Sequence, residues 1–215
     1  MAIKKMKIYN FDQNSKEWEE IRKGKITASK FTKLITPSLE MPLSRGRKEP
    51  TSTAKEAMCE IIGNAICTQN SDDFQTFSMI RGTECEPRAR NLYQEAYLTE
   101  VKEIGFIASD CGYYGFSPDG LVGENGMIEI KTQCQKKHIY CKVFSFDEWL
   151  KKYKPQILLS MITNPNIQWC DCISYNEDFE DDNRLIVHRY HRNEEEIEKA
   201  KVVLDYWVGE LKKYK

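Results

Sequence analysis

The spacing of apolar residues predicts helices at the start of the chain. Trp18 and Ile21 stand about one helical turn apart among charged residues, so residues 16–23 are expected to form a short amphipathic helix. A second helix is expected to begin at Thr27 or Ser29, because small hydroxyl residues favour helix starts and apolar residues follow on one face. The first part of the chain is therefore predicted to be helical.

A loop and two longer helices are predicted next. Residues 36–52 contain three prolines and a glycine, which are typical of a loop. The tip of this loop is basic, with Arg45, Arg47 and Lys48. Helices are predicted over 53–67 and about 74–97, the second of them interrupted near Gly82 and resumed around Pro87, since proline is tolerated in a first turn.

The pattern changes to that of β-strands after residue 101. Short apolar runs alternate with glycine up to residue 132, and the turn 123–126 separates 115–122 from 127–132 as in a hairpin. Further along, the pattern predicts helices over 147–153 and 155–163, strands over 167–175 and 185–191, and a last helix that Asn193 caps.

These elements indicate a single domain over residues 1–215. The expected fold class is α/β (α+β), with helices packed around a mixed central β-sheet. No stretch of the sequence approaches the roughly 20 apolar residues that a membrane-spanning helix needs, and the polar first residues do not resemble a secretory signal. We therefore expect a soluble intracellular protein without a membrane partner.

The eight cysteines are scattered, and an intracellular chain keeps its thiols reduced, so free structural thiols are expected. Cys170 and Cys172 would point the same way on a strand, but no second pair stands nearby to complete a zinc site. The three histidines, His138, His188 and His191, lack metal-ligand neighbours in the sequence and are expected to be structural.

The net charge of −1 conceals an uneven distribution. Residues 1–55 carry a net charge of +7 and 131–160 of +5, whereas 56–130 carry −9 and 161–215 carry −4. Two basic zones beside an acidic one suit a protein that binds a polyanion and also holds cations. Solvated surface charge with a local bias is the alternative.

Three side chains of the predicted hairpin carry candidate chemistry. Glu129 and Lys131 are two residues apart on a strand, so both leave the same face, which we expect to be wet, while Ile128 and Ile130 point to the core. Asp119 precedes a glycine on the partner strand and can stand across the hairpin from Glu129. The pattern thus brings two carboxylates and an ammonium together.

Such a group fits a metal site for phosphodiester chemistry. Two close carboxylates repel each other unless a cation satisfies them, and hard oxygen ligands suit Mg²⁺ or Mn²⁺. A metal ion held there can polarise a phosphodiester and lower the pKa of a bound water, while Lys131 positions that water and offsets transition-state charge. A hairpin with exposed acids and a surface salt bridge is the alternative.

The longer motif makes the signal more specific. It consists of GFSPDGLV at 115–122 followed after a turn by IEIK at 128–131. This string resembles the motif of the PD-(D/E)XK nuclease superfamily, and in particular the λ-exonuclease-like (YqaJ-type) viral recombinase family. Three further segments are similar to that family in the same order: WEEIRKGKITAS at 18–29, GTECEPRAR at 82–90 and PQILLSM at 155–161.

The resemblance implies roles for the acidic residues and the lysine. Asp119, Glu129 and the main-chain carbonyl of Ile130 would bind the catalytic metal, and Glu86 would complete a second metal site. Two Mg²⁺ ions are thus implied, for which Mn²⁺ could substitute. Lys131 would be the residue that activates water.

The resemblance also implies a supporting role for Gln156 and a site for the terminal 5′-phosphate formed by Arg22 and Ser29, with Ser117 beside them. Physical chemistry agrees with the phosphate site, because arginine offers a planar fork and a serine near a helix start adds a hydroxyl beside unpaired N–H groups.

Alternatives remain for several of these residues. Glu84 competes with Glu86, whose spacing of four from Gly82 matches the family. Arg22 could be a charged residue on a solvated helix face, and Gln156 only a polar residue early in a helix. Three aromatic residues near the motif could be core, or one could stack on a terminal base: Tyr113, Tyr114 and Phe116.

The resemblance predicts a Mg²⁺-dependent exonuclease that digests duplex DNA from the 5′ end and leaves 3′ single-stranded tails for recombination. It implies a ring-shaped homotrimer and a single-strand annealing partner. The residues after Lys131, Thr132-Gln133-Cys134, depart from the Cys-Pro pair that often follows in the family. The rival functions are a restriction- or repair-type endonuclease on the same core and a non-catalytic DNA-binding module.

Overall fold

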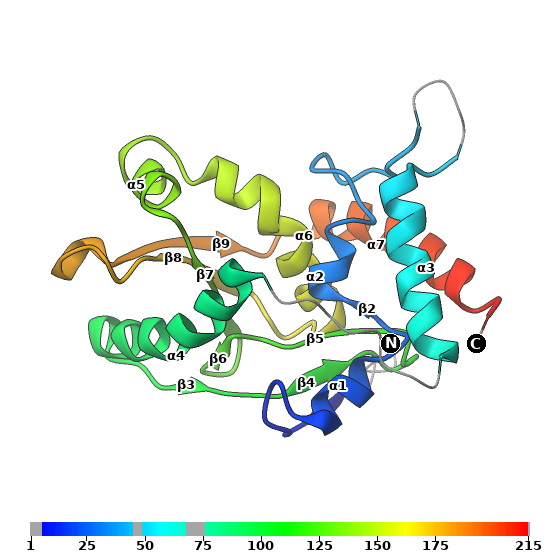
Figure 1. Cartoon of the computed structure of the whole chain (residues 1–215), viewed down its shortest axis with the longest axis horizontal. Helices are drawn as coiled ribbons and strands as arrows, with labels where there is room; N and C mark the ends of the chain where they lie inside the picture. Colours follow the sequence, from blue (N-terminus) through cyan, green and yellow to red (C-terminus); the bar gives the residue numbers. More distant parts are fainter. Residues whose placement is uncertain (1–5, 45–48, 68–75, 215) are drawn as a thin grey trace.

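Two mixed β-sheets form the centre of the protein, and helices cover them (Figure 1). The structure, a computed structural model, describes residues 6–44, 49–67 and 76–214. The strands are β1 (Lys7–Tyr9), β2 (Ile26–Thr27), β3 (Val101–Lys102), β4 (Phe106–Ala108), β5 (Tyr114–Phe116), β6 (Gly120–Val122), β7 (Gly126–Thr132), β8 (Trp169–Tyr175) and β9 (Leu185–His191). The helices are α1 (Lys16–Arg22), α2 (Ala28–Phe31), α3 (Ser52–Ile66), α4 (Phe77–Tyr97), α5 (Gln135–Val143), α6 (Asp147–Thr163), α7 (Glu194–Leu211) and the short 3₁₀ helix η1 (Asp181–Asn183).

The predicted fold class is confirmed, with the strands divided between two sheets. The smaller sheet has the order β1-β4-β5-β2 and the larger one the order β3-β6-β7-β8-β9. Each contains one parallel pair, β2 with β5 and β7 with β8. Strand β7, which contains Glu129 and Lys131, pairs with β6 on one side and with β8 on the other and so lies in the middle of the larger sheet.

The run predicted as one hairpin strand over 115–122 is in fact two strands. β5 belongs to the smaller sheet and β6 to the larger one, and Ser117-Pro118-Asp119 connects them. Pro118 has no N–H to donate to a strand ladder, so a break is expected at this point. The hairpin itself is confirmed in a shorter form, because Gly120–Val122 pairs antiparallel with Gly126–Ile128.

Both faces of β7 are covered, so the expected wet face of the hairpin was wrong. Ile128 and Ile130 belong to a cluster of buried apolar residues that includes Ala89 and Tyr93 of α4. Met127, on the other face of β7, belongs to a separate and larger cluster that includes residues of α6 and α7. Central strands next to a parallel neighbour are commonly buried on both sides. Consequently the side chain of Glu129 lies almost entirely inside the protein, with 5% of its surface exposed.

Helices α4 and α6 run without interruption through prolines at which the sequence predicted breaks. Pro87 lies inside α4, which also contains Gly82, and Pro155 lies inside α6. A proline removes one helical hydrogen bond, but burial of the helix face can offset this cost. In α6 that face is Pro155 itself and the buried residues 157–161.

Several other boundaries follow or extend the predictions. Helices α1, α3 and α7 and strands β8 and β9 occur where the pattern placed them, and Asn193 accepts hydrogen bonds from two N–H groups of the first turn of α7. The sequence did not predict β1 or α5. The basic loop tip formed by Arg45, Arg47 and Lys48 lies outside the described residues.

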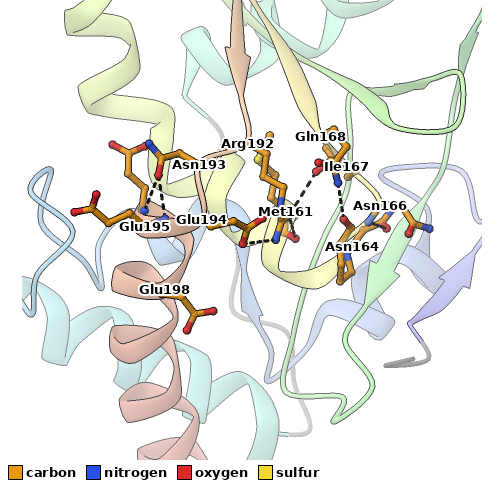
Figure 2. Close-up of polar contacts among 12 residues, drawn as sticks. Met161, Asn164, Asn166, Ile167, Gln168, Arg192, Asn193, Glu194, Glu195 and Glu198 are labelled. Atoms are coloured by element: carbon orange, nitrogen blue, oxygen red, sulfur yellow. Dashed lines mark hydrogen bonds and ion pairs between the residues drawn. The ribbon is translucent and has the colours of Figure 1, made fainter. Parts of the chain in front are cut away.

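Arg192 ties the end of β9 to the end of α6 (Figure 2). Its Nη1 donates to the carbonyl of Met161 at 2.8 Å, and its Nε donates to Glu194 at 2.5 Å in the first turn of α7. Asn164, at the end of α6, accepts a hydrogen bond from the N–H of Asn166 and so shapes the turn into β8. These contacts fix the helix that carries Gln156 against the larger sheet.

His138 is fully buried on the inner side of α5, and its contacts indicate the structural role predicted from the sequence. Its Nε2 lies 2.6 Å from the carbonyl of Asn183, which requires a proton on Nε2, and its Nδ1 lies 2.8 Å from Oγ of Ser174 and can accept the hydroxyl proton. Burial lowers the pKa of His138, because the charged imidazolium is poorly solvated there.

This environment makes the free energy of unfolding depend on pH. The pKa of His138 in the folded state lies below its unfolded value of about 6.5, so the unfolded chain binds the proton more readily. The free energy of unfolding should therefore decrease as the pH falls from about 6.5 through the folded-state pKa. We expect His138→Gln to cost about 1–3 kcal/mol at pH 8 and to flatten the decline. Urea unfolding at pH 8 and pH 5.5 measures both effects. The exposed His191→Gln is the control, and an equal decline in all three proteins would contradict the prediction.

All eight cysteines are free thiols, and Cys85, Cys170 and Cys172 are buried. No helix within the described residues is long and apolar enough to span a membrane.

Candidate active site

Asp119, Glu129 and Lys131 come together where β6 begins and β7 continues past it. The pairing of Gly120 with Ile128 sets Asp119 across from Glu129. Oδ2 of Asp119 accepts a hydrogen bond from the N–H of Ile130 at 2.6 Å and lies 3.9 Å from Nζ of Lys131, which also forms an ion pair with Glu129. The structure thus brings together the three residues that the sequence singled out.

The main-chain carbonyl of Ile130 points to the same edge of β7 as these side chains. In an extended strand, the N–H and the C=O of one residue face the same neighbouring strand. The N–H of Ile130 points to Asp119, and β6 ends its pairing with β7 at Gly120. The Ile130 carbonyl therefore faces the edge of β7 at which Asp119 lies.

Glu86 reaches the same region from α4 through Arg90, a residue that the sequence did not single out. Nη2 of Arg90 donates to Oε1 of Glu86 at 2.6 Å, and its Nε donates to the main-chain carbonyl of Asp119 at 2.9 Å. Nη1 forms an ion pair at 2.7 Å with Glu103. The spacing of Glu86 and Arg90 by four residues on a helix was the available signal, but the contact with Asp119 is tertiary.

Gln156 contacts the site directly. Its Nε2 donates to Oε1 of Glu129 at 2.8 Å from the middle of α6. One turn earlier on the same helix, the ring of Tyr153 lies 5.5 Å from Nζ of Lys131, within the range of a cation–π contact. The sequence did not identify Tyr153. Helix α6 therefore orients both members of the Glu129–Lys131 ion pair.

The electrostatics of the site show a shortage of positive charge. Burial raises the pKa of Glu129 to about 7, although Lys131 opposes this effect. Burial and the charge of Asp119 likewise raise the pKa of Glu86 to about 7, with Arg90 in opposition. Burial lowers the pKa of Lys131, but the charges of Glu129 and Asp119 raise it by more in sum, so the ammonium holds its proton.

The residues present fit a hard divalent cation. The carboxylates of Asp119 and Glu129 both lie within ion-pair distance of Lys131, the Ile130 carbonyl faces the edge at which Asp119 lies, and oxygen donors of this kind suit Mg²⁺ or Mn²⁺. The raised pKa values of Glu86 and Glu129 indicate carboxylates that a cation would stabilise in ionised form. Across the described part of the chain, no three acidic, cysteine or histidine side chains stand as a preassembled cluster, and Arg90 and Lys131 form ion pairs with the two glutamates.

Arg22 and Ser117 are connected through Trp18. The guanidinium of Arg22 stacks 3.6 Å from the centre of the Trp18 ring. The indole N–H of Trp18 donates to Oγ of Ser117 at 2.8 Å and to the carbonyl of Gly105 at 3.0 Å. Trp18 therefore links the Arg22 guanidinium to the hydroxyl of Ser117, which stands two residues before Asp119 in the chain.

Ser29 lies near the same edge of the smaller sheet. β2 and β5 run parallel, with Thr27 beside Gly115, so the chain leaves both strands in the same direction toward Ser29 and Ser117. Ser29 is exposed in the first turn of α2, a helix of four residues whose start is Thr27. The expected helix start at Thr27 is confirmed, although the Thr27 side chain makes no capping hydrogen bond.

The aromatic residues near the motif separate into different environments. Phe116 is buried in the core, whereas Tyr113 and Tyr114 are half-buried against it. Burial raises the pKa of Tyr114 to about 12. The core alternative therefore holds for Phe116.

The comparison with known proteins agrees with this geometry. The YqaJ-like viral recombinase domain matches residues 17–165, well over half of the chain. The protein belongs to this family. The matched region includes all four motif segments and extends from α1 to the end of α6, so every residue of the site described above lies within it.

Solved structures similar to this YqaJ-like chain are exonucleases. The alkaline exonuclease LHK-Exo from Laribacter hongkongensis has a TM-score of 0.75 and 28% sequence identity, over 92% of this chain and 93% of that chain. LHK-Exo in complex with dAMP has a TM-score of 0.76, with the same identity and coverage. A phage-related exonuclease from Haemophilus somnus 129PT shares the fold, with a TM-score of 0.64 and 17% identity over 89% of this chain and 96% of that chain. No curated protein matches the chain.

Proposed function

We propose that this protein is a Mg²⁺-dependent 5′→3′ exonuclease on double-stranded DNA that leaves 3′ single-stranded tails for recombination by strand annealing. Membership of the YqaJ-like viral recombinase family and the similarity to LHK-Exo make the protein a DNA nuclease. The observation that supports the proposed chemistry most directly is the convergence of Asp119, Glu129 and Lys131 at one edge of β7.

Each residue of the site has a part in hydrolysis of a phosphodiester bond. Asp119, Glu129 and the carbonyl of Ile130 would hold one divalent cation, and Glu86 would contribute to a second. The cation, when bound, supplies Lewis acidity toward the phosphate and lowers the pKa of water. Lys131 keeps its proton on Nζ, where it can orient the attacking water and offset charge on the phosphate. Gln156 holds the Glu129 carboxylate in place.

The polarity of digestion is proposed from the group beside Asp119. The guanidinium of Arg22, supported by the Trp18 ring, can bind a terminal phosphate with two parallel hydrogen bonds, and the Ser117 and Ser29 hydroxyls can donate further ones. A terminal phosphate bound there would set the first phosphodiester of the 5′-ended strand near the carboxylates. The enzyme would then begin at a 5′ end and would not depend on base sequence.

The proposed assembly and partners follow from the family resemblance. A ring-shaped homotrimer would keep the enzyme on one duplex end during successive cleavages. A single-strand annealing protein would receive the 3′ tail. Mn²⁺ is expected to substitute for Mg²⁺, because both ions take oxygen ligands.

Digestion of a linear duplex with a 5′-phosphate tests the proposal. One strand carries a label at its 5′ end in one sample and at its 3′ end in another. With Mg²⁺ or Mn²⁺, the 5′ label is expected in mononucleotides from the first seconds, whereas the 3′ label stays on shortening strands. EDTA should abolish both reactions, because the carboxylates alone offer no Lewis acid.

A covalently closed circular duplex serves as the control substrate. The proposed enzyme leaves it intact, whereas a restriction- or repair-type endonuclease nicks it. Early release of the 3′ label would contradict the proposed polarity. If neither label is released with Mg²⁺ and the DNA is nevertheless bound, the non-catalytic alternative is correct.

A further inference from the structure

Helix α5 exposes large apolar side chains that helices of globular proteins ordinarily bury. Four such residues occur within six positions and are exposed by 36% to 75% of their surface: Ile139, Tyr140, Val143 and Phe144. The opposite side of α5 contacts the protein through His138 and Cys141. Because these apolar residues face outward beside lysines, the sequence shows no apolar stripe of the kind that predicts a packed helix.

Lys136, Tyr140 and Phe144 form a line along the outer side of α5, and we refer to these three residues as the α5 strip. Residues four apart lie one above the other on a helix, so the three side chains are neighbours. The rings of Tyr140 and Phe144 are in contact, with their centres 5.2 Å apart. The strip therefore combines one cation with two adjoining aromatic rings.

The charge around the α5 strip is positive. Residues 135–144 contain Lys136, Lys137 and Lys142 and no acidic residue. Lys142 donates to the side-chain carbonyl of Asn183. Neither Lys136 nor Lys137 forms an ion pair with any acid in the described ranges. Two exposed ammonium groups are thus available to an anionic partner.

The first residue of the α5 strip, Lys136, lies close to the catalytic strand along the chain. Helix α5 begins four residues after Lys131, a separation that an extended chain spans in at most about 14 Å. The connecting residue Gln133 contacts the hydroxyl of Tyr153, whose ring faces Lys131. In Figure 1, α5 lies at the end of β7 that carries the site, beyond which the chain enters α6.

We propose that the α5 strip binds the unpaired DNA strand that digestion exposes. Exposed rings can stack on bases only where these are unpaired, and lysines beside them bind the backbone phosphates. A protein partner fits less well, because lysines are depleted at the centre of protein interfaces. The inference rests on the proposed function for the source of this strand, but binding itself does not require cleavage.

Binding of a fluorescein-labelled oligothymidylate in EDTA tests the inference, because no digestion occurs under that condition. The double variant Tyr140→Ala/Phe144→Ala is expected to weaken binding about tenfold or more, since it removes the rings on which the bases would stack. Lys136→Gln/Lys137→Gln, which leaves the rings intact, is expected to reduce the slope of log affinity against log salt by about 1.4. Tyr206→Ala, on α7 and 43% exposed, and Lys199→Gln/Lys201→Gln are matched controls that should bind like the wild type.

The outcomes separate this inference from the proposed function. If the wild type digests duplex DNA but both α5 variants bind the oligonucleotide as tightly as the wild type, the inference is wrong and the nuclease proposal stands. If the wild type shows no digestion but the α5 variants lose binding, the nuclease proposal is wrong and the inference about α5 stands. If light scattering shows that the ring variant changes its oligomeric state while the lysine variant retains wild-type salt dependence, α5 is a subunit contact and the inference is overturned.

Discussion

Replacing Lys131 by methionine is expected to lower the rate of duplex digestion by about 10²–10⁴-fold. Nζ of Lys131 forms ion pairs with both Asp119 and Glu129, so its removal takes away the group proposed to orient water and offset phosphate charge. Methionine keeps an unbranched side chain of nearly the same length but removes the charge, including the contact of Nζ with the ring of Tyr153. Single-turnover release of mononucleotides from a linear duplex in Mg²⁺ measures the effect.

A loss of DNA binding must be distinguished from a loss of chemistry in this variant. Affinity for the same duplex in Ca²⁺ should change by only a few fold, because Lys131 is mostly buried. Lys102→Met, on the exposed face of β3, removes the same charge away from the site and should digest DNA at the wild-type rate. Wild-type digestion by Lys131→Met would exclude Lys131 from the mechanism.

The sequence was sufficient to place Asp119, Glu129 and Lys131 because their arrangement depends on local rules. Strand alternation puts Glu129 and Lys131 on one face, and a tight turn brings Asp119 back across from Glu129. The surroundings of these residues could not be predicted in the same way, because they depend on segments far away in the sequence. Whether this face of β7 is wet depends on α6, which reaches Glu129 through Gln156 from a distant part of the chain.

Other errors have the same origin in tertiary packing. The sequence predicted breaks at Gly82 and before Pro155, but burial of one helix side keeps α4 and α6 continuous. The strand predicted over 115–122 divides because its two halves find partners in different sheets. Helix α5 was missed since its apolar residues point outward, a pattern that hydrophobic periodicity alone cannot assign to a surface.

Arg90 and Trp18 show how much of the site depends on residues that are not expected to touch the substrate. Trp18 lies between Arg22 and Ser117, and Arg90 contacts both Glu86 and the main chain of Asp119. The two side chains hold together segments that are far apart in the sequence. A motif search finds the ligands of such a site, whereas their alignment is visible only in the folded chain.

Replacing Arg90 by glutamine should therefore affect both stability and activity. Arg90 is nearly buried and is the only described cation in contact with Glu86, so its loss leaves a partly buried carboxylate without its partner. We expect a destabilisation of about 3 kcal/mol. We also expect about a 10²-fold slower digestion at a temperature where the variant is folded, because Asp119 loses its main-chain anchor. Urea unfolding and single-turnover digestion measure the two effects.

Glu103→Gln separates the positioning role of Arg90 from its ion pairs. Glu103 is 69% exposed and contacts Arg90 at Nη1, away from the nitrogens that hold Glu86 and Asp119. Its replacement should cost no more than about 1 kcal/mol and leave digestion near the wild-type rate. If Glu103→Gln slows digestion as much as Arg90→Gln, the effect of Arg90 arises from charge at the surface. If Arg90→Gln is unstable but digests at the wild-type rate, Asp119 keeps its position without Arg90, and the main-chain hydrogen bond has no part in aligning the site.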